Sequence, residues 1–531
     1  MNARWYIVLW WFLLAGTLPG ATMHGPDKEA TARAVFDRLV DAWGESSRPA
    51  PYFTLTAARR SGARVEGNLI VLEEAAYDLC MSFGAEADYA LATVLAHELI
   101  HYYAGHARGG SGIGLLADPG PDDREAEADY RGGFLAYLAG YPTSNVMPRV
   151  LEGLYNAYGL PDTLTDYPTL NERKALADRT YRELQELIEV FEMAVALTAL
   201  DRYGEAAPYY DHLLQSFPSR EIYNNAGVVY ARAALPLFQP TTLRYVYPIE
   251  LDLRTRLDGQ TRSLTTDRAT REAYLHTARR YFERARLLDP AYAPAVLNLG
   301  STHALLAASL LESDPDSLQR ELAADRQLEA TLRAREAARM GNPTTADHAR
   351  VLLGILAAER RDSLAAEALL AGENPLAVEN RTVLRTGHVP PRTAARQAER
   401  FIIPETVGGQ GLADMRLAPE IEGSARRIEN GSYPLRLVRR QPPAETVSVL
   451  HHSAADGEEE LLLAWVQPGY VGTTALEIGC GQPRSRVIEE YGSPGYSIAT
   501  AGGEVLVYTD HQLAFCLRNG AVASWFLYAE R

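Results

Sequence analysis

The sequence predicts a mainly α-helical protein of several domains: an α+β domain, then an α-helical solenoid of repeats, then a small α+β domain. Three observations predict this architecture. The chain has 531 residues, which is too long for a single hydrophobic core. An alanine-rich apolar run over residues 87–104 has the composition of a helix. Two later segments, 203–218 and 278–290, share one helical pattern that ends in proline.

Residues 1–21 are predicted to be a secretory signal peptide. Arg4 precedes an apolar run, 5–16, and small residues follow as far as Ala21. The run is shorter than the roughly 20 residues that a spanning helix needs. Because Pro19 makes a poor cleavage site, an uncleaved N-terminal anchor is the alternative. We expect a periplasmic or secreted protein that contacts a membrane only if this segment is retained, and no later stretch that spans one.

The charge of the chain bears on its partners. With a formal net charge of −16 and no basic cluster, nucleic acid is not an expected partner. The hydrophobic fraction of 47% and the charged fraction of 23% are those of ordinary globular proteins.

Residues His97 to His101 read His-Glu-Leu-Ile-His inside the predicted helix 87–104. Positions i and i+4 share one face of a helix, so both imidazoles can reach a single metal ion. Glu98 follows the first histidine and is placed to take a proton from a water molecule at that metal. The alternative is a helix with two chance histidines, against which the acidic segment that follows argues.

A second helix, rich in acidic residues, is predicted to start after a glycine-rich loop at 106–123. A catalytic zinc takes three protein ligands, and the third is a histidine or a carboxylate. Glu125, in the first turn, can supply it, and Asp129, one turn later on the same face, can hydrogen-bond a ligand histidine. Glu127 lies about 160° around the helix from Asp129 and is the less suitable ligand. The alternative is that acids merely collect at a helix N-terminus.

The pattern His-Glu-Leu-x-His followed by Glu-x-Glu-Ala-Asp resembles that of the M48 metallopeptidases. This gluzincin family includes periplasmic proteases with tetratricopeptide repeats. The resemblance covers roughly residues 30–180 and implies a zinc metallopeptidase domain over 22–180 with one Zn²⁺ per chain. It also implies roles for five residues: zinc ligands His97, His101 and Glu125, catalytic base Glu98, and Asp129 as the acid that orients a ligand histidine.

Two further features of the family bear on the site. The family often has a Thr-His-Pro…Arg stretch after the metal-binding helices, where this chain reads Asp-Tyr-Pro-Thr-Leu-Asn-Glu-Arg over 166–173. Tyr167 replaces the histidine, whose role therefore does not carry over. The tyrosine is either a pocket residue that donates to an oxyanion or a packing residue. Residues 68–72 resemble the strand beside the active-site helix and are expected to pair with substrate as an added strand.

Residues 181–386 are predicted to form helical repeats of the tetratricopeptide type. Pro218 and Pro290 end the two matching segments and lie 72 residues apart, close to two repeats of about 34 residues. Between them, residues 236–272 do not fit the repeat, and the alternating stretch 243–254 predicts an inserted loop or hairpin. A generic helical bundle is the alternative. Repeats of this kind usually present a concave surface to peptides or proteins, so a protein partner is expected there.

Prolines, glycines and arginines predict a linker over 387–440. The remaining residues, 441–531, predict a small α+β domain. Its strands are expected at 459–466, 475–478, 504–509, 513–517 and 523–528, and its helix at 485–491. Asn519-Gly520 between two strands predicts a hairpin turn, whereas His451-His452 is expected in a loop.

The three cysteines do not make a disulfide scaffold. Cys80 is expected to be a buried apolar residue. Cys480 and Cys516 fall in the C-terminal segment and are able to pair in an oxidising compartment.

These features predict a zinc-dependent metalloendopeptidase that acts on unfolded or partner-presented proteins in envelope protein quality control. Glu98 is expected to remove a proton from the attacking water and to carry it to the leaving amine. The helical repeats are expected to restrict which chains reach the metal. The alternative is an envelope interaction protein or chaperone whose protease fold has little turnover. No ligand is missing from the motif, which favours the enzyme.

Overall fold

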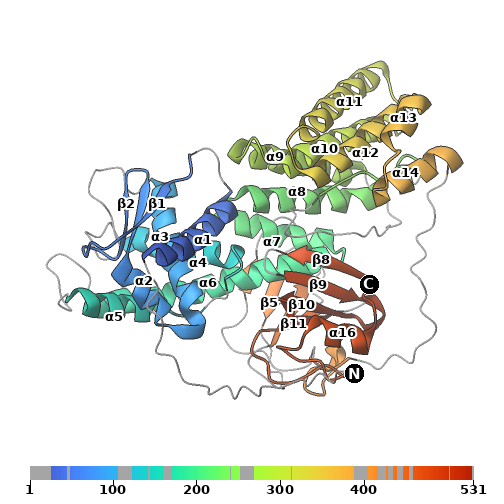
Figure 1. The fold of residues 1–531 in the computed structure, drawn as a ribbon. Helices are drawn as coiled ribbons and strands as arrows, with labels where there is room; N and C mark the ends of the chain where they lie inside the picture. The colour runs from blue at the N-terminus through green and yellow to red at the C-terminus, as the bar shows by residue number, and fades with distance from the viewer. Residues whose placement is uncertain are drawn as a thin grey trace, which may run out of the picture.

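The computed structural model is mainly helical, with a small sheet near the N-terminus and a larger one at the C-terminus (Figure 1). The predicted signal peptide, residues 1–21, lies outside the part of the chain that the structure describes. The described residues are 25–44, 48–105, 122–141, 144–159, 169–239, 241–250, 268–312, 314–387, 405–415, 426–428, 435–438, 447–453, 459–500 and 503–528.

The N-terminal part has a helix, α1 (Gly25–Trp43), and a three-stranded sheet. β3 (Leu69–Glu73) is the central strand: β1 (Tyr52–Thr56) pairs with it in parallel and β2 (Ala63–Glu66) pairs with it antiparallel. The strand expected at 68–72 is therefore present. The expectation that it pairs with substrate is wrong, because both of its edges are already hydrogen-bonded. Strand order depends on long-range pairing, which the local sequence pattern does not show.

Glu73, at the end of β3, holds the loop between β1 and β2 through its buried carboxylate. That carboxylate accepts hydrogen bonds from the backbone N–H groups of residues 60–62 and from the Tyr158 hydroxyl, and it pairs with Arg64 Nη1 at 2.8 Å. Burial alone would raise the pKa of Glu73. The hydroxyl and the backbone donors outweigh burial and hold this pKa below its ordinary value.

We expect Glu73→Gln to lower the free energy of unfolding by about 1–3 kcal/mol, because an amide cannot accept from all of these donors. The stabilisation is present above the unfolded pKa of about 4.3 and is lost as the pH falls through the lower folded pKa, so the difference from wild type shrinks in acid. Urea unfolding across this pH range measures it. Glu66→Gln is the matched control, since Glu66 pairs with the same Arg64 but has a side chain that is 45% exposed. Equal losses in the two variants would contradict the prediction.

Two helices carry the residues of the predicted metal site. α3 (Ala87–Ala104) is rich in alanine and leucine, is buried along most of its length, and ends at Gly105, whose φ of 74° terminates the helix. α4 (Asp122–Leu138) packs directly against α3. The smaller helices of this part are α2 (Glu74–Met81), η1 (Gly84–Glu86) and α5 (Met147–Tyr158).

α6 (Leu170–Ala199) connects this part to the rest of the chain. It packs against both α4 and α5, and a capping box of Thr169 and Glu172 fixes its first turn. The predicted boundary between residues 180 and 181 falls inside this continuous helix. A chain cut at that boundary would lose nearly two thirds of α6, a helix of 30 residues that packs against α4.

Beyond α6, consecutive helices pack on one another in an array, and α14 packs on α12 (Figure 1). Close crossings use small residues: a Cβ at Gly227 would lie 2.6 Å from the ring of Phe282. The members are α7 (Tyr203–Ser216), α8 (Arg220–Ala234), η2 (Leu235–Leu237), α9 (Arg268–Leu288), α10 (Ala293–Leu311), α11 (Ser317–Ala337), α12 (Pro343–Glu359), α13 (Ser363–Leu369) and α14 (Pro375–Thr386).

Among the described residues, α10 alone is long and apolar enough to cross a membrane by length and composition, with a mean hydropathy of 1.3. Within the structure, 83% of its apolar window is buried, and the helix packs against α9 and α11. The sequence leads us to expect no such stretch beyond the N-terminal segment. The structure differs because a helix enclosed by neighbours on several sides is apolar all round.

Of the loop or hairpin expected in the predicted insertion, the described residues 243–250 form a loop. They pair with no strand among the described residues. Instead, side chains of α8, α10 and α14 hydrogen-bond their main chain. The alternating pattern indicates a buried extended segment correctly, but it cannot tell which partner satisfies the main chain. Residues 251–267 lie outside the described part.

The C-terminal part is an antiparallel sheet of eight described strands in the order β4-β5-β6-β7-β11-β10-β9-β8. Its hairpin is confirmed: Arg518 pairs with Ala521, and Asn519 and Gly520 between them have φ values of 51° and 77°. The elements are α15 (Leu412–Met415), β4 (Arg426–Ile428), β5 (Leu435–Val438), β6 (Val447–Ser453), β7 (Glu459–Val466), α16 (Arg484–Tyr491), β8 (Tyr496–Thr500), β9 (Gly503–Tyr508), η3 (Thr509–His511), β10 (Leu513–Arg518) and β11 (Ala521–Tyr528).

The structure differs from the sequence interpretation at the start of this part. β4 and β5 lie within the predicted linker 387–440 but belong to the sheet, and Val407 and Met415 from the same stretch are buried in a core with α16. Two local predictions also fail: His451-His452 lies in β6 rather than in a loop, and residues 475–478 form no strand. Prolines and glycines mark turns between short strands as readily as they mark linkers.

The two faces of this sheet are buried against different partners. Trp525 and Phe515 face the core that contains α16, whereas Trp465 and Phe526 face the core of the helical body. Arg518 joins the sheet to the helices, since its Nη2 donates to Glu192 Oε1 of α6 at 3.0 Å and to the Tyr137 hydroxyl of α4 at 2.7 Å.

The three cysteines are free. Cys480 packs into the α16 core and Cys516 into the helical core. The pairing considered from the sequence is therefore excluded, because the two thiols contact opposite faces of the sheet. Cys80 is fully buried, and burial raises the pKa of its thiol to about 12, as expected for a small apolar core residue.

Candidate metal centre

α3 and α4 bring two histidines and a glutamate to one point. His97 Nε2 lies 3.0 Å from His101 Nε2 and 3.5 Å from Glu125 Oε2, and His101 Nε2 lies 3.3 Å from Glu125 Oε1. All three side chains are buried. Within the described part of the chain, no other group of three or more histidine, cysteine or acidic side chains converges in this way.

The separations between these donor atoms fit a tetrahedral zinc ion. Zinc bonds of about 2.0–2.2 Å to nitrogen and oxygen place neighbouring donors of a tetrahedron roughly 3.3–3.6 Å apart. The observed separations run from 3.0 to 3.5 Å. Two imidazoles and one carboxylate are a common zinc donor set, and three protein donors leave a fourth position for water or substrate. The residues present therefore fit the metal that the motif implies.

Asp129 fixes the orientation of the first histidine. Its Oδ1 lies 2.7 Å from His97 Nδ1, so the ring presents Nε2 to the other donors. Burial lowers the pKa of His97, but hydrogen bonds with Asp129 and Glu125 outweigh burial and raise this pKa to about 10. Carboxylates thus surround the imidazoles, and the site favours a positive charge at its centre.

Arg173, from the first turn of α6, contacts Glu125. Its Nη2 lies 3.3 Å from Glu125 Oε2, and both side chains are buried. Burial would raise the pKa of Glu125, but His101, His97 and Arg173 hold it far below its ordinary range. The motif spacing alone assigns Arg173 no role. The arginine that closes the stretch 166–173 is the sequence signal that points to it.

Two of the remaining residues considered from the sequence lie on the helices that carry the donors. Glu98 is fully buried on α3, next to His97. Glu127 lies outside the donor group: its side chain is 40% exposed and pairs with Arg131 Nη1 at 2.7 Å. Tyr167 lies outside the described residues.

Gly132 allows α3 and α4 to approach closely at the metal site. It lies about one turn after Asp129, and a Cβ at this position would lie 2.9 Å from the backbone nitrogen of His97 and 3.1 Å from the carbonyl carbon of Ala96. A rotamer change cannot relieve contacts with backbone atoms. The absence of a side chain at Gly132 therefore sets the helix separation at which Asp129 reaches His97.

We expect Gly132→Ala to push α4 away from α3 and to weaken the Asp129–His97 hydrogen bond. Zinc affinity should fall by about 10–100-fold, the range for loss of a partner that orients a ligand. Gly133→Ala is the matched control, because its Cβ would lie 2.4 Å from Leu184 Cδ2, the end of a flexible side chain. Competition with a chromogenic chelator measures both affinities. Equal affinities in the two variants would show that the close crossing does not support the site.

Comparison with known proteins adds no family assignment: no protein-family model matches the chain, and no curated protein matches it in sequence. The likeness to the M48 metallopeptidases therefore rests on the motif residues alone.

Proposed function

We propose that this chain is a zinc-dependent metalloendopeptidase that cleaves unfolded or partner-presented proteins in the periplasm or after secretion. The observation that carries the proposal is the buried convergence of His97 and His101 of α3 with Glu125 of α4, together with the position of Glu98 beside the first ligand on α3. Three ligands alone suit a metal site of many kinds. The adjacent glutamate supplies the general base that hydrolysis needs.

Each residue of the centre has a distinct task in this chemistry. A zinc ion held by the three donors would act as a Lewis acid toward a water molecule and a peptide carbonyl. Glu98 takes the proton of the attacking water and delivers it to the leaving amine. Asp129 keeps the His97 ring in the orientation that presents Nε2. Together with His101 and His97, Arg173 lowers the pKa of Glu125 and so favours its charged form.

The N-terminal sheet offers substrate a place to pair through its main chain. Among its described strands, β3 is enclosed and β1 and β2 are the outer strands. β2 also packs against α3, so we assign the substrate to the outer edge of β2. An extended segment added there gains main-chain hydrogen bonds with little dependence on sequence. A folded protein offers no such segment.

Two further parts of the protein adjoin the metal-bearing helices. α6 leads directly into the helical array, and the C-terminal sheet contacts α4 and α6 through Arg518. We therefore keep the prediction that the array restricts the metal site to chains that are unfolded or presented by a partner.

Digestion of one protein in two states tests the proposal. A small disulfide-bonded protein is offered in native form and after reduction and alkylation, with and without a zinc chelator. We expect cleavage of the reduced form, none of the native form, and loss of cleavage with the chelator. Cleavage that resists the chelator would contradict a metallopeptidase. Zinc-loaded protein that binds the reduced form without cleaving it would favour the alternative, an envelope interaction protein or chaperone.

A further inference from the structure

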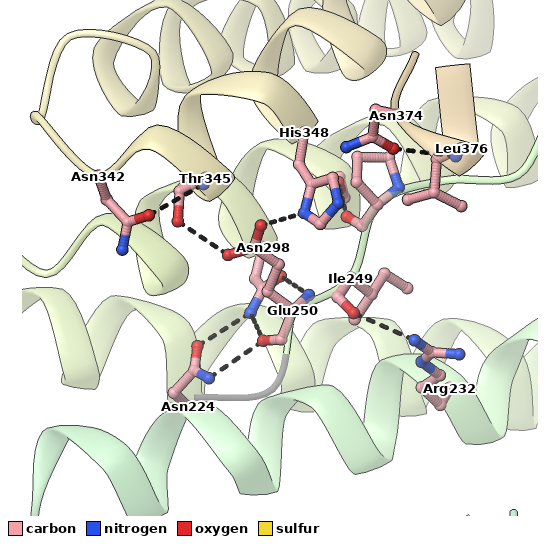
Figure 2. Close-up of polar contacts among 12 residues, drawn as sticks. Asn224, Arg232, Ile249, Glu250, Asn298, Asn342, Thr345, His348, Asn374 and Leu376 are labelled. Carbon is pink, nitrogen blue, oxygen red and sulfur yellow. Dashed lines mark hydrogen bonds and ion pairs between the residues drawn. The ribbon is translucent and has the colours of Figure 1, made fainter. Parts of the chain in front are cut away.

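Residues 246–250 lie extended against α8, α10, α12 and α14. Figure 2 shows the contacts that hold Ile249 and Glu250. Three fully or almost fully buried asparagines, one each from α8, α10 and α14, hydrogen-bond their main chain. We call these three residues the amide face: Asn224, Asn298 and Asn380.

Two members of the amide face each clamp one residue at both of its main-chain groups. Val246 N–H donates to Asn380 Oδ1 at 2.8 Å, and its carbonyl accepts from Asn380 Nδ2 at 2.9 Å. Glu250 N–H donates to Asn298 Oδ1 at 2.7 Å, and its carbonyl accepts from Asn298 Nδ2 at 2.5 Å. Asn224 donates to the same carbonyl at 3.2 Å. Side-chain amides thus take the place of a neighbouring strand.

The carbonyls between the two clamps are also bound by side chains. Ser301 of α10 donates to the Pro248 carbonyl at 2.5 Å, and Arg232 of α8 donates to the Ile249 carbonyl at 3.1 Å. Four of the five carbonyls from 246 to 250 therefore accept a hydrogen bond from a helix side chain.

Two side chains of the segment contact α12 in chemically distinct ways. The Glu250 carboxylate accepts from the Thr345 hydroxyl at 2.9 Å and pairs with His348 Nδ1 (Figure 2). The Tyr247 hydroxyl donates to Glu359. Charge-assisted hydrogen bonds of this kind give selectivity for an acid at the position of Glu250.

This pattern is that of a bound peptide. Main-chain groups in buried structure pair mostly with other main-chain groups, whereas here side chains on helices recognise them. Side-chain amides that hydrogen-bond the main chain can bind an extended segment of varied sequence. The contacts with α12 add selectivity for particular side chains. We propose that the amide face is a binding site for an extended segment of a partner protein, in which tyrosine, proline, an aliphatic residue and glutamate follow one another. Residues 246–250 occupy that site as an intramolecular competitor.

Because residues 246–250 occupy the amide face, a partner segment needs a higher affinity to displace them. A tethered ligand acts at an effective concentration on the order of millimolar. If the untethered segment binds with a dissociation constant of about 10 µM, the site is open about 1% of the time, and a partner of equal affinity binds about 100-fold more weakly than it would to an open site. This inference goes beyond the proposed function and requires neither metal nor hydrolysis.

The experiment uses the full-length protein and a labelled peptide with the sequence of residues 243–250, Leu-Arg-Tyr-Val-Tyr-Pro-Ile-Glu, amidated at its C-terminus. Fluorescence anisotropy gives its affinity for wild type and for the double variant Tyr247→Ala/Glu250→Ala, whose own segment lacks both α12 contacts. We expect the double variant to bind about 100-fold more tightly. A peptide of scrambled order and one with glutamine for its glutamate are expected to bind at least about 10-fold more weakly.

Adding Asn298→Ala to the double variant should weaken binding by about 10-fold or more, because one main-chain clamp is lost. Unaltered binding would place the peptide elsewhere and overturn the proposal. A double variant that is folded by circular dichroism but binds no more tightly than wild type would overturn it as well.

Hydrogen exchange of the wild-type protein shows whether residues 246–250 can leave the amide face, even if the double variant does not fold. A displaceable segment leaves while the helices stay folded, so the amides of Val246 and Glu250 should exchange at least about 10-fold faster than those at the centre of α10. Equal protection would show that the segment is a fixed part of the fold, and would overturn the proposal.

Discussion

Glu98→Gln is expected to lower the rate of peptide hydrolysis by about 10²–10⁴-fold or more, the usual cost of losing a general base. Glutamine keeps the volume of the side chain and can hydrogen-bond the attacking water, but it cannot accept the proton. Because the donor cluster of His97, His101 and Glu125 is untouched, zinc content and melting temperature should stay near those of wild type. Initial rates on a fluorogenic peptide, with metal analysis of the same samples, measure the effect.

A Glu98→Gln variant that cleaves at a rate near that of wild type would remove Glu98 from the mechanism. If the variant loses activity together with its zinc, the glutamate would instead support the metal site. The expected combination, in which zinc is retained and turnover is lost, also makes the variant a trap for substrates. Proteins that co-purify with it from cells that produce it would identify the natural substrates.

Glu125→Ala is expected to remove zinc, because the site loses one of its three protein donors. Loss of a partner that orients a ligand lowers zinc affinity by about 10–100-fold, and Asp129→Asn is expected to show a fall of that size. The fall in Glu125→Ala should be larger. Glu127→Ala is the matched control, since Glu127 lies two positions along the same helix with a side chain that is 40% exposed. Zinc per chain after dialysis, measured by mass spectrometry, separates the three variants.

Full zinc occupancy and activity in Glu125→Ala would contradict the assignment of the third ligand. In that case Glu127→Ala would be the next variant expected to lose the metal. Loss of zinc in both Glu125→Ala and Glu127→Ala would indicate damage to α4 itself, which circular dichroism of each protein detects.

The local parts of the fold could be predicted because their determinants are local. Two histidines four positions apart on one helix must share a face, and an acid in the first turn of a neighbouring helix can reach the same point. The Asn519-Gly520 hairpin follows in the same way, from two residues that adopt positive φ readily. The strand at β7 follows from a short continuous apolar run, and the end of the helix at α16 follows from the glycine after it.

Features that depend on distant pairing could not be predicted. β3 reads as a strand, but only long-range pairing makes it the central one. β4 and β5 are short, and their residues gain order from the sheet that they join rather than from their own propensity. The opposite placement of Cys480 and Cys516 likewise depends on which core each thiol enters.

In the helical array, side-chain contacts between residues distant in sequence could not be predicted either. Residues 243–250 alternate as a strand does, yet their hydrogen-bonding partners are asparagines on three different helices. Nothing in the sequence around Asn224, Asn298 or Asn380 marks them as members of one surface. Arg173 is a further case, since its contact with Glu125 joins α6 to α4.

Reconstitution of the metal-free protein with zinc shows whether the metal centre carries the peptidase activity. The purified protein is stripped with a chelator, and zinc is returned in known ratios while cleavage of an unfolded protein is followed. We expect no cleavage without metal and a linear return of activity that saturates at one zinc per chain, with no return of activity in Glu98→Gln. Activity that survives removal of the metal, or zinc binding at this ratio with no cleavage by the wild-type protein, would contradict the claim that His97, His101 and Glu125 form the metal centre of a peptidase.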